Sequence, residues 1–386
     1  MTDRLIRITT ALAVAAVASV AAIISYQHAY ELIRAYGESG ATARMLPLTV
    51  DGAGVYGQTN LVSDIPGVAR VTDSSLVNPW GMSEFPDGPL WISDNNADVA
   101  TLYTGDQHGG PLTAVPLVVK IAGGAPTGQV FNPTSSFVVS SGKASAAALF
   151  LFASENGDIT RWAPTVPAQP PGGTSDQAEV GFSDPNAVYK GLAIDASGAS
   201  PRLFAASFRT GAIDVFDATF HRVAHPGLFT DPGLPAGYAP FGIANLGGKL
   251  YVTYALQDAA MHDDVAGPGH GFVDVYSLGG TLLRRLVTRG ALNSPWGLVL
   301  ATRHFGRFSR DLLIGNFGDG FIHAYDPASG ALEGTLTNGD GNPIQINGLW
   351  GLLFGDNAAA SRNTLFFSAG IADEAHGLLG TLRPEH

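Results

Sequence analysis

The richest concentration of chemically active side chains lies in one insertion, residues 257–271, which reads QDAAMHDDVAGPGHG. It carries His262, Asp263, Asp264 and His270. Carboxylates beside imidazoles can hold a divalent cation, and oxygen ligands would favour Ca²⁺ or Mg²⁺. The same groups can act as a general acid and base. Asp and Gly are also ordinary turn residues, and a loop His is commonly solvated, so a purely structural role stays open.

The elements that must position these residues come from a repeat. Six times the chain shows a Gly beside an aromatic or polar residue, an apolar run, a second β-rich run and a polar turn. The repeat glycines are 47 to 63 residues apart, which is typical of a four-stranded propeller blade. The six glycines are Gly81, Gly128, Gly191, Gly242, Gly297 and Gly351. The sequence therefore predicts an all-β fold, a six-bladed β-propeller over residues 56–386.

Closure of such a ring needs a strand that joins its two ends, because open strand edges invite aggregation. The last repeat ends after its third strand, and residues 59–63 form a β-rich run before the first repeat. We predict that residues 59–63 supply the outer strand of the last blade.

Equivalent loops of all blades fall on one face of a propeller, so polar residues far apart in sequence are expected to gather at one channel mouth. A second turn with carboxylates and an imidazole, residues 373–376, belongs to this face. The candidate ligand-contacting residues are His262, Asp263, Asp264, His270, Asp94, Glu374, His376 and Lys190. The candidate metal ligands, for Ca²⁺ or Mg²⁺, are Glu155, Asn316 and Asp319.

Large aromatics stand just before four repeat glycines, as Trp80, Phe241, Trp296 and Trp350. They could form a platform for a sugar or another flat ligand. Recurrence at one repeat position favours packing between blades instead, since large aromatics bury much area.

The N-terminal sequence predicts a membrane anchor or a secretory signal. Arg4 and Arg7 precede a charge-free apolar run over residues 8–26, which is near the length that spans a bilayer. A cleaved secretory signal is the alternative. We predict an anchor or signal helix over residues 1–37, a linker over 38–55, and a propeller that lies outside the cytoplasm, tethered to the cell membrane or secreted.

Composition excludes several functions. The formal net charge of −12 and the lack of a basic cluster disfavour nucleic-acid binding. The absence of Cys removes disulfides, Cys-ligated metals and thiol nucleophiles.

Five long motifs lie within about residues 58–382: NLVSDIPGVARVTDSSLVNPWGM, GYAPFGIANLGGKLYVTYALQDAAMHDDVAGPGHGFVDVY, ALNSPWGLVLA, DLLIGNFGDGFIHAYDP and ADEAHGLLGTL. These motifs resemble a family of exported bacterial propeller proteins of uncharacterised function, some of which carry exosortase-type sorting tails. The segment ISYQHAYELIRAYGESGATARMLPLTVDG resembles the first helix and loop of actinobacterial membrane proteins associated with plasmid spread.

Two functions are compatible with these residues. The first is an extracytoplasmic, membrane-tethered binding or scaffolding module that holds a small molecule, glycan or protein at the face with the His262 loop. The second is a metal-dependent hydrolase or lyase, by analogy of fold to lactonases and streptogramin lyases.

Overall fold

The computed structural model describes residues 54–86, 88–105, 112–169, 173–355 and 361–385. The chain divides near Asp51, and the described residues belong to the second unit. The predicted helix over residues 1–37, and the linker except its last two residues, lie outside the described residues. Within the described ranges, no helix has the length and apolar character needed to cross a membrane.

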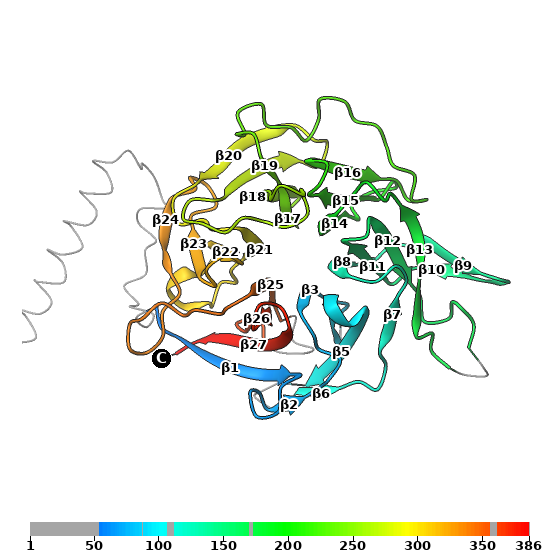
Figure 1. The fold of residues 1–386 in the computed structure, drawn as a ribbon, viewed down its shortest axis with the longest axis horizontal. Coiled ribbons are helices and arrows are strands. Elements are labelled where there is room, and N and C mark those ends of the chain that lie inside the picture. Colours follow the sequence, from blue (N-terminus) through cyan, green and yellow to red (C-terminus); the bar gives the residue numbers. More distant parts are fainter. Residues whose placement is uncertain (1–53, 87, 106–111, 170–172, 356–360, 386) are drawn as a thin grey trace, which may run out of the picture. The chain divides into compact units, whose positions relative to one another are not determined.

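The described residues form an all-β propeller whose sheets follow one another round a ring in chain order (Figure 1). One five-stranded sheet has the order β2 (Val71–Thr72), β1 (Tyr56–Ser63), β27 (His376–Pro384), β26 (Leu365–Ile371) and β25 (Leu349–Phe354). A three-stranded sheet contains β14 (Tyr189–Asp195), β15 (Arg202–Ser207) and β16 (Ala212–Phe216). Two four-stranded sheets contain β17 (Tyr238–Leu246), β18 (Lys249–Leu256), β19 (Phe272–Ser277) and β20 (Leu282–Thr288), and β21 (Pro295–Leu300), β22 (Leu312–Asn316), β23 (Ile322–Tyr325) and β24 (Leu332–Thr335).

The six predicted blades do not form six separate sheets, because the structure has four separate blade sheets and one larger sheet that contains two of the repeats. The larger sheet has the order β3 (Pro79–Glu84), β4 (Leu90–Asp94), β5 (Val99–Gly105), β7 (Val119–Ile121), β13 (Gln177–Ser183), β12 (Asp158–Trp162), β11 (Phe150–Ser154) and β8 (Pro126–Phe131), with β6 (Leu112–Ala114) paired to β5. The cause is a short parallel pairing of β7 with β13, Gln177 opposite Lys120, which fuses two repeats at their outer edges. A hairpin of β9 (Val138–Ser141) and β10 (Ala144–Ala147) and two short 3₁₀ helices, η2 (Asn95–Ala97) and η4 (Gly306–Phe308), complete the described elements.

The repeat glycines bring the inner strands of the ring into backbone contact. A Cβ on Gly81 would lie 2.5 Å from the Thr127 carbonyl oxygen, and one on Gly242 would lie 2.1 Å from the Trp296 carbonyl oxygen. A Cβ on Gly351, in the last repeat, would lie 2.5 Å from the Trp80 oxygen in the first. The inner strands β3, β8, β14, β17, β21 and β25 contact one another in a closed cycle. Glycine is required because a side chain would push neighbouring inner strands apart.

The ring is closed by the strand that the sequence predicted. β1 pairs antiparallel with β27 along its length, with Thr59 opposite Thr381, and lies outside it in the last sheet. Beyond the end of β1, the Asp64 carboxylate accepts a hydrogen bond from the Gly377 amide at 2.8 Å. The first and last strands of the described chain are therefore held together by their antiparallel pairing.

The four aromatics before the repeat glycines pack against one another inside the ring, as the packing interpretation predicted. Trp80 and Trp350 stack with ring centroids 3.4 Å apart, and Trp296 meets Trp80 edge-on at 5.9 Å. All of these side chains, with Phe241, are buried. They are not a surface platform; their edge-to-face and stacked contacts help to hold the inner strands together.

Replacing Gly242 by Ala tests the close approach of the inner strands. We expect the free energy of unfolding to fall by about 1–3 kcal/mol, because the backbone must move to admit a Cβ. Gly279→Ala is the matched control, since the nearest atom to its Cβ would be Ser277 Oγ at 3.7 Å. Thermal unfolding of the two variants checks this; equal melting temperatures would contradict it.

Candidate functional site

The mouth of the ring is built on a position shared by all six repeats, the residue that directly follows the second strand. These residues are Asn95, Glu155, Phe208, Gln257, Phe317 and Ala372. They meet as the ring geometry predicted: Asn95 bonds Glu155, Gln257 bonds the Phe208 carbonyl oxygen, and Phe317 and Ala372 line one cavity. Loops that lie up to 277 residues apart in the sequence therefore form one site.

Lys190, the second residue of β14, is the centre of this site. Its side chain is only 2% exposed, and its ammonium is paired with Glu155, which is 14% exposed. The Asp263 carboxylate lies 3.4 Å from the same nitrogen. The Lys190 ammonium also lies over the rings of Trp80 and Phe208, 5.1 and 5.9 Å from their centroids. Carboxylates and aromatic faces together offset the cost of burying this charge.

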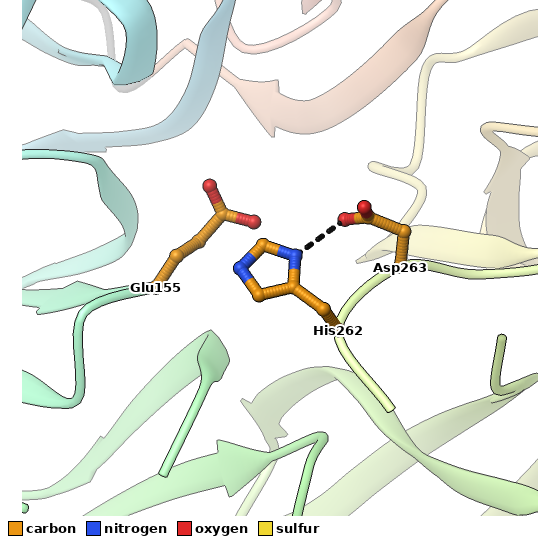
Figure 2. Close-up of side chains that lie close together, drawn as sticks. All are labelled: Glu155, His262 and Asp263. Atoms are coloured by element: carbon orange, nitrogen blue, oxygen red, sulfur yellow. Dashed lines mark hydrogen bonds and ion pairs between the residues drawn. The ribbon is translucent and has the colours of Figure 1, made fainter. Parts of the chain in front are cut away.

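The insertion after β18 contributes an imidazole and a carboxylate. His262 Nδ1 lies 2.8 Å from Asp263 Oδ1, and the Asp258 carboxylate accepts hydrogen bonds from the backbone amides of both residues. Figure 2 shows the His262 ring between Glu155 and Asp263. One ligand atom from each of these three residues lies within 4.8 Å of the others, so they could hold a metal ion.

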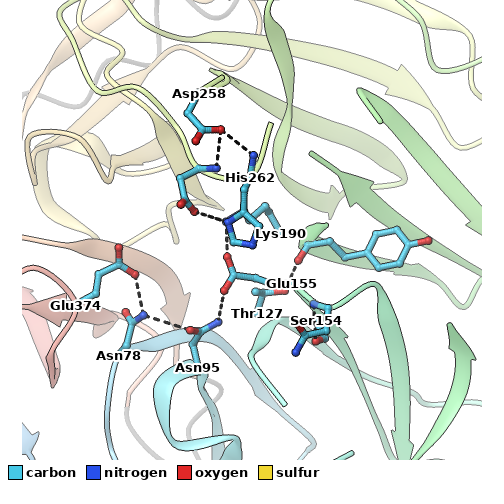
Figure 3. A network of polar contacts seen from close by, with 12 residues as sticks. Asn78, Asn95, Thr127, Ser154, Glu155, Lys190, Asp258, His262 and Glu374 are labelled. Carbon is cyan, nitrogen blue, oxygen red and sulfur yellow. Dashed lines mark hydrogen bonds and ion pairs between the residues drawn. The ribbon is translucent and has the colours of Figure 1, made fainter. Parts of the chain in front are cut away.

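Amide side chains continue the network to the last repeat (Figure 3). Asn95 Nδ2 donates to Glu155 Oε2 at 3.0 Å, and Asn78 Nδ2 donates to Glu374 Oε2 at 2.7 Å. Asn96 Nδ2 donates to the Glu374 carbonyl oxygen at 2.7 Å. Asn95, Asn96 and Asp258 were not among the predicted residues. Asn95 could have been found, because it occupies the same repeat position as Glu155.

A cavity of about 450 Å³ opens beside this network. Its lining combines carboxylate and amide side chains with Ala266, Ala372 and Phe317, and the Phe317 ring stacks on Trp350 with ring centroids 4.0 Å apart. The lining residues are Ala266, Phe317, Gly318, Asp319, Gln345, Asn347, Gly348, Gly370, Ala372, Asp373 and Glu374.

The turn that borders the cavity has unusual backbone angles. Ala372, Asp373 and Glu374 have φ values of 53°, 52° and 63°, so three consecutive residues with side chains are left-handed. This conformation costs on the order of 1 kcal/mol or more per residue, and it persists where surrounding contacts hold it. The bonds from Asn78 and Asn96 to Glu374 provide such contacts.

The charges of the site shift each other's titration. Burial raises the pKa of Glu374, with nearby Glu155 acting in the same direction and the Asn78 bond opposing it. Burial also raises the pKa of Asp264. For Asp263 burial acts upward too, but Lys190 and His262 together outweigh it and lower the pKa of that carboxyl.

The structure brings some of the predicted residues together and separates others. Lys190, Glu155, His262, Asp263 and Glu374 share the network, and Asp319 lines the cavity. The remaining predicted residues do not join the network through any contact found in the described part of the chain, apart from the electrostatic effects of Lys190 and Asp263 on Asp264. His270 Nδ1 bonds the Val265 carbonyl oxygen, His376 Nδ1 bonds Asp64 at 2.6 Å, Asn316 Nδ2 donates to the Ala291 oxygen, and Asp94 is fully buried near Thr101 and Asp73.

Of the three candidate metal ligands, only Glu155 belongs to the triad with His262 and Asp263. Asp319 accepts a hydrogen bond from Asn293 at 3.1 Å, and Asn316 is buried at the end of β22. The predicted combination of Glu155 with Asn316 and Asp319 as one ligand set has no support in these contacts.

Two virus proteins are similar to most of this chain. "Uncharacterized protein R648" of Acanthamoeba polyphaga mimivirus is 33% identical over 329 residues, which is 83% of this chain and 78% of the relative. "Uncharacterized protein L690" of the same virus is 32% identical over 328 residues, 83% of this chain and 84% of the relative. Residues 8–61 match a family described as "Protein of unknown function (DUF2637)", a match that covers residues 8–37 of the predicted N-terminal helix and ends inside β1.

Solved structures resemble the fold. A streptogramin B lyase aligns with a TM-score of 0.50 at 13% identity, over 85% of this chain and 97% of that one. Virginiamycin B lyase from Staphylococcus aureus aligns with a TM-score of 0.50 at 14% identity, over 86% and 99%. At such identity the likeness shows the propeller fold alone.

The raised pKa of Glu374 predicts a pH dependence of stability. Between the usual Glu pKa and the raised one, the folded state keeps a proton that the unfolded state has lost, so stability falls as pH rises through this interval. Glu374→Gln does not titrate and still offers an oxygen to Asn78. The melting temperature of E374Q relative to wild type should therefore rise as pH increases through this interval. Asp340→Asn, at an exposed turn, controls for net charge; a constant difference between E374Q and wild type would contradict the prediction.

Proposed function

This chain belongs to the same protein family as the mimivirus proteins R648 and L690, whose names assign no activity, so we propose a function from the geometry of the site: the protein is a binding module. The ligand would occupy the cavity at the mouth of the ring. The observation that carries the proposal is the cavity of about 450 Å³ where loops of several repeats converge. Backbone strain in residues 372–374 supports it, since strained segments cluster at ligand-contacting sites.

The lining favours a ligand that donates hydrogen bonds. Asp319, Asp373 and Glu374 supply carboxylates and Gln345 and Asn347 supply amides, whereas no Lys or Arg is among the described lining residues. Carboxylates accept hydrogen bonds and repel anions. We infer a small polar ligand with hydroxyl or amino groups. The Phe317 ring adds an apolar surface against which a sugar or an alkylammonium group could lie.

We also propose that the module works outside the cytoplasm, tethered by residues 1–37 or released if they are cleaved. The charge-free run over residues 8–26 after Arg4 and Arg7 supports this. Peptide mapping of the mature protein tests it, because a cleaved signal would leave no peptide from this run.

For the architecture, we propose that the ring functions as six blades, with the two repeats of the nine-stranded sheet each forming one. The closed cycle of six inner strands supports this count. A consequence is that all six loops after the second strand belong to one ligand-binding face.

A metal-dependent hydrolase or lyase is the second candidate. The proximity of Glu155, His262 and Asp263 favours it, because carboxylate and imidazole ligands suit divalent cations. Elemental analysis of the purified protein tests this candidate, which requires a stoichiometric metal that is lost in Glu155→Gln.

Ligand binding is tested by thermal unfolding with glucosamine, glucose, putrescine and citrate as probes. We expect glucosamine or putrescine to raise the melting temperature and citrate to leave it unchanged. Asp373→Asn, which removes a charge without breaking any described side-chain contact, should weaken binding of the ammonium probes by up to about fivefold, as expected for an exposed charge pair. Asp340→Asn is the control for net charge. A response to citrate alone, or equal binding to D373N, would contradict the proposed ligand class.

A further inference from the structure

The Lys190 ammonium lies beside two of the three residues that could hold a metal ion. It is paired with Glu155 and lies 3.4 Å from Asp263 Oδ1, and both carboxylates belong to the three-residue set that could hold a metal. We propose that Lys190 is the resident cation of this site, so that the wild-type protein needs no divalent ion there. This assignment and the metal-dependent second candidate exclude each other, and a stoichiometric metal on wild type that is lost in Glu155→Gln would overturn the assignment. Removal of the ammonium should turn Glu155, His262 and Asp263 into a site for a divalent cation such as Ca²⁺ or Mg²⁺.

Burial supports this assignment. The Lys190 side chain is 2% exposed, and its nitrogen lies over the rings of Trp80 and Phe208. A buried ammonium is tolerated only where anions or aromatic faces replace its water. A metal ion that entered the triad would have to take both carboxylates away from the buried ammonium, and two cations would then repel each other at short range.

A cation at the position of the Lys190 ammonium offsets the repulsion between the surrounding carboxylates. Glu155, Asp263 and the nearby Glu374 are three carboxylates, and Glu155 and Asp263 both influence the titration of Glu374. Lys190 opposes that influence. Among the described residues, Lys190 forms ion pairs with both Glu155 and Asp263. His262 contacts Asp263 as well. Without Lys190 the carboxylates would repel one another, and an external cation could replace the lost charge.

The test is cation rescue of Lys190→Ala in the full chain, followed by thermal unfolding. The probes are CaCl₂, MgCl₂ and ethylammonium chloride, each at about 5 mM and compared with NaCl of equal ionic strength so that screening is matched. Ethanol is the neutral counterpart of ethylammonium. We expect K190A to melt at a lower temperature than wild type and to recover by about 4 °C or more with a cation probe but not with ethanol. Wild type should change by less than about 1 °C.

Two further variants assign the rescue to this site. Lys190→Arg keeps a positive charge and should not respond to the divalent ions. The double variant E155Q/K190A lacks one of the carboxylates and should lose most of the rescue seen in K190A. If K190A yields no folded protein, the same titrations on Lys190→Met decide the matter, because Met keeps the apolar stem beside Trp80 and Phe208.

The proposal is overturned if wild type binds Ca²⁺ or Mg²⁺ as well as K190A does, or if no cation probe stabilises K190A or K190M. This inference does not rest on the proposed ligand. A protein that binds none of the polar probes could still show cation rescue at Lys190, and the two failures are therefore distinguishable.

Discussion

Close contact between the backbones of neighbouring inner strands is the constraint on which the site depends. Gly81, Gly242 and Gly351 each stand where a Cβ would meet a carbonyl oxygen of the next repeat at 2.5 Å or less. Because the strands converge this far, the residues that follow the second strands meet at one mouth. The β1–β27 ladder preserves the arrangement by tying the first described strand to the last.

Convergence has an electrostatic consequence. Carboxylates from separate repeats come within reach of one another, and their repulsion must be offset. Lys190 offsets this repulsion, and the side-chain amides of Asn78 and Asn95 donate hydrogen bonds to Glu374 Oε2 and Glu155 Oε2, respectively. Amide donors of this kind stabilise a carboxylate without adding charge. The site is thus a charge network beside a cavity with an acidic lining.

Much of the scaffold could be predicted because it depends on patterns that are local in the sequence. The spacing of the repeat glycines predicted the ring, and the β-rich run over residues 59–63 predicted the closing strand. The number of separate sheets could not be predicted, because it depends on two residue pairs between β7 and β13. Lys190 and Glu155 were both predicted on the correct face, but their pairing across 35 residues depends on side-chain reach. His376 was predicted at the mouth of the ring but does not join the network there, because it forms a hydrogen bond with Asp64, which lies just beyond β1.

A double-mutant cycle on Lys190 and Glu155 tests the central claim most directly, that loops of different repeats converge on one buried charge network. The free energies of unfolding of wild type, Lys190→Met, Glu155→Gln and the double variant give the coupling energy of the pair. The account predicts a coupling of about 1–3 kcal/mol, as found for residues in one buried network. A coupling near zero, as many exposed ion pairs give, would contradict it.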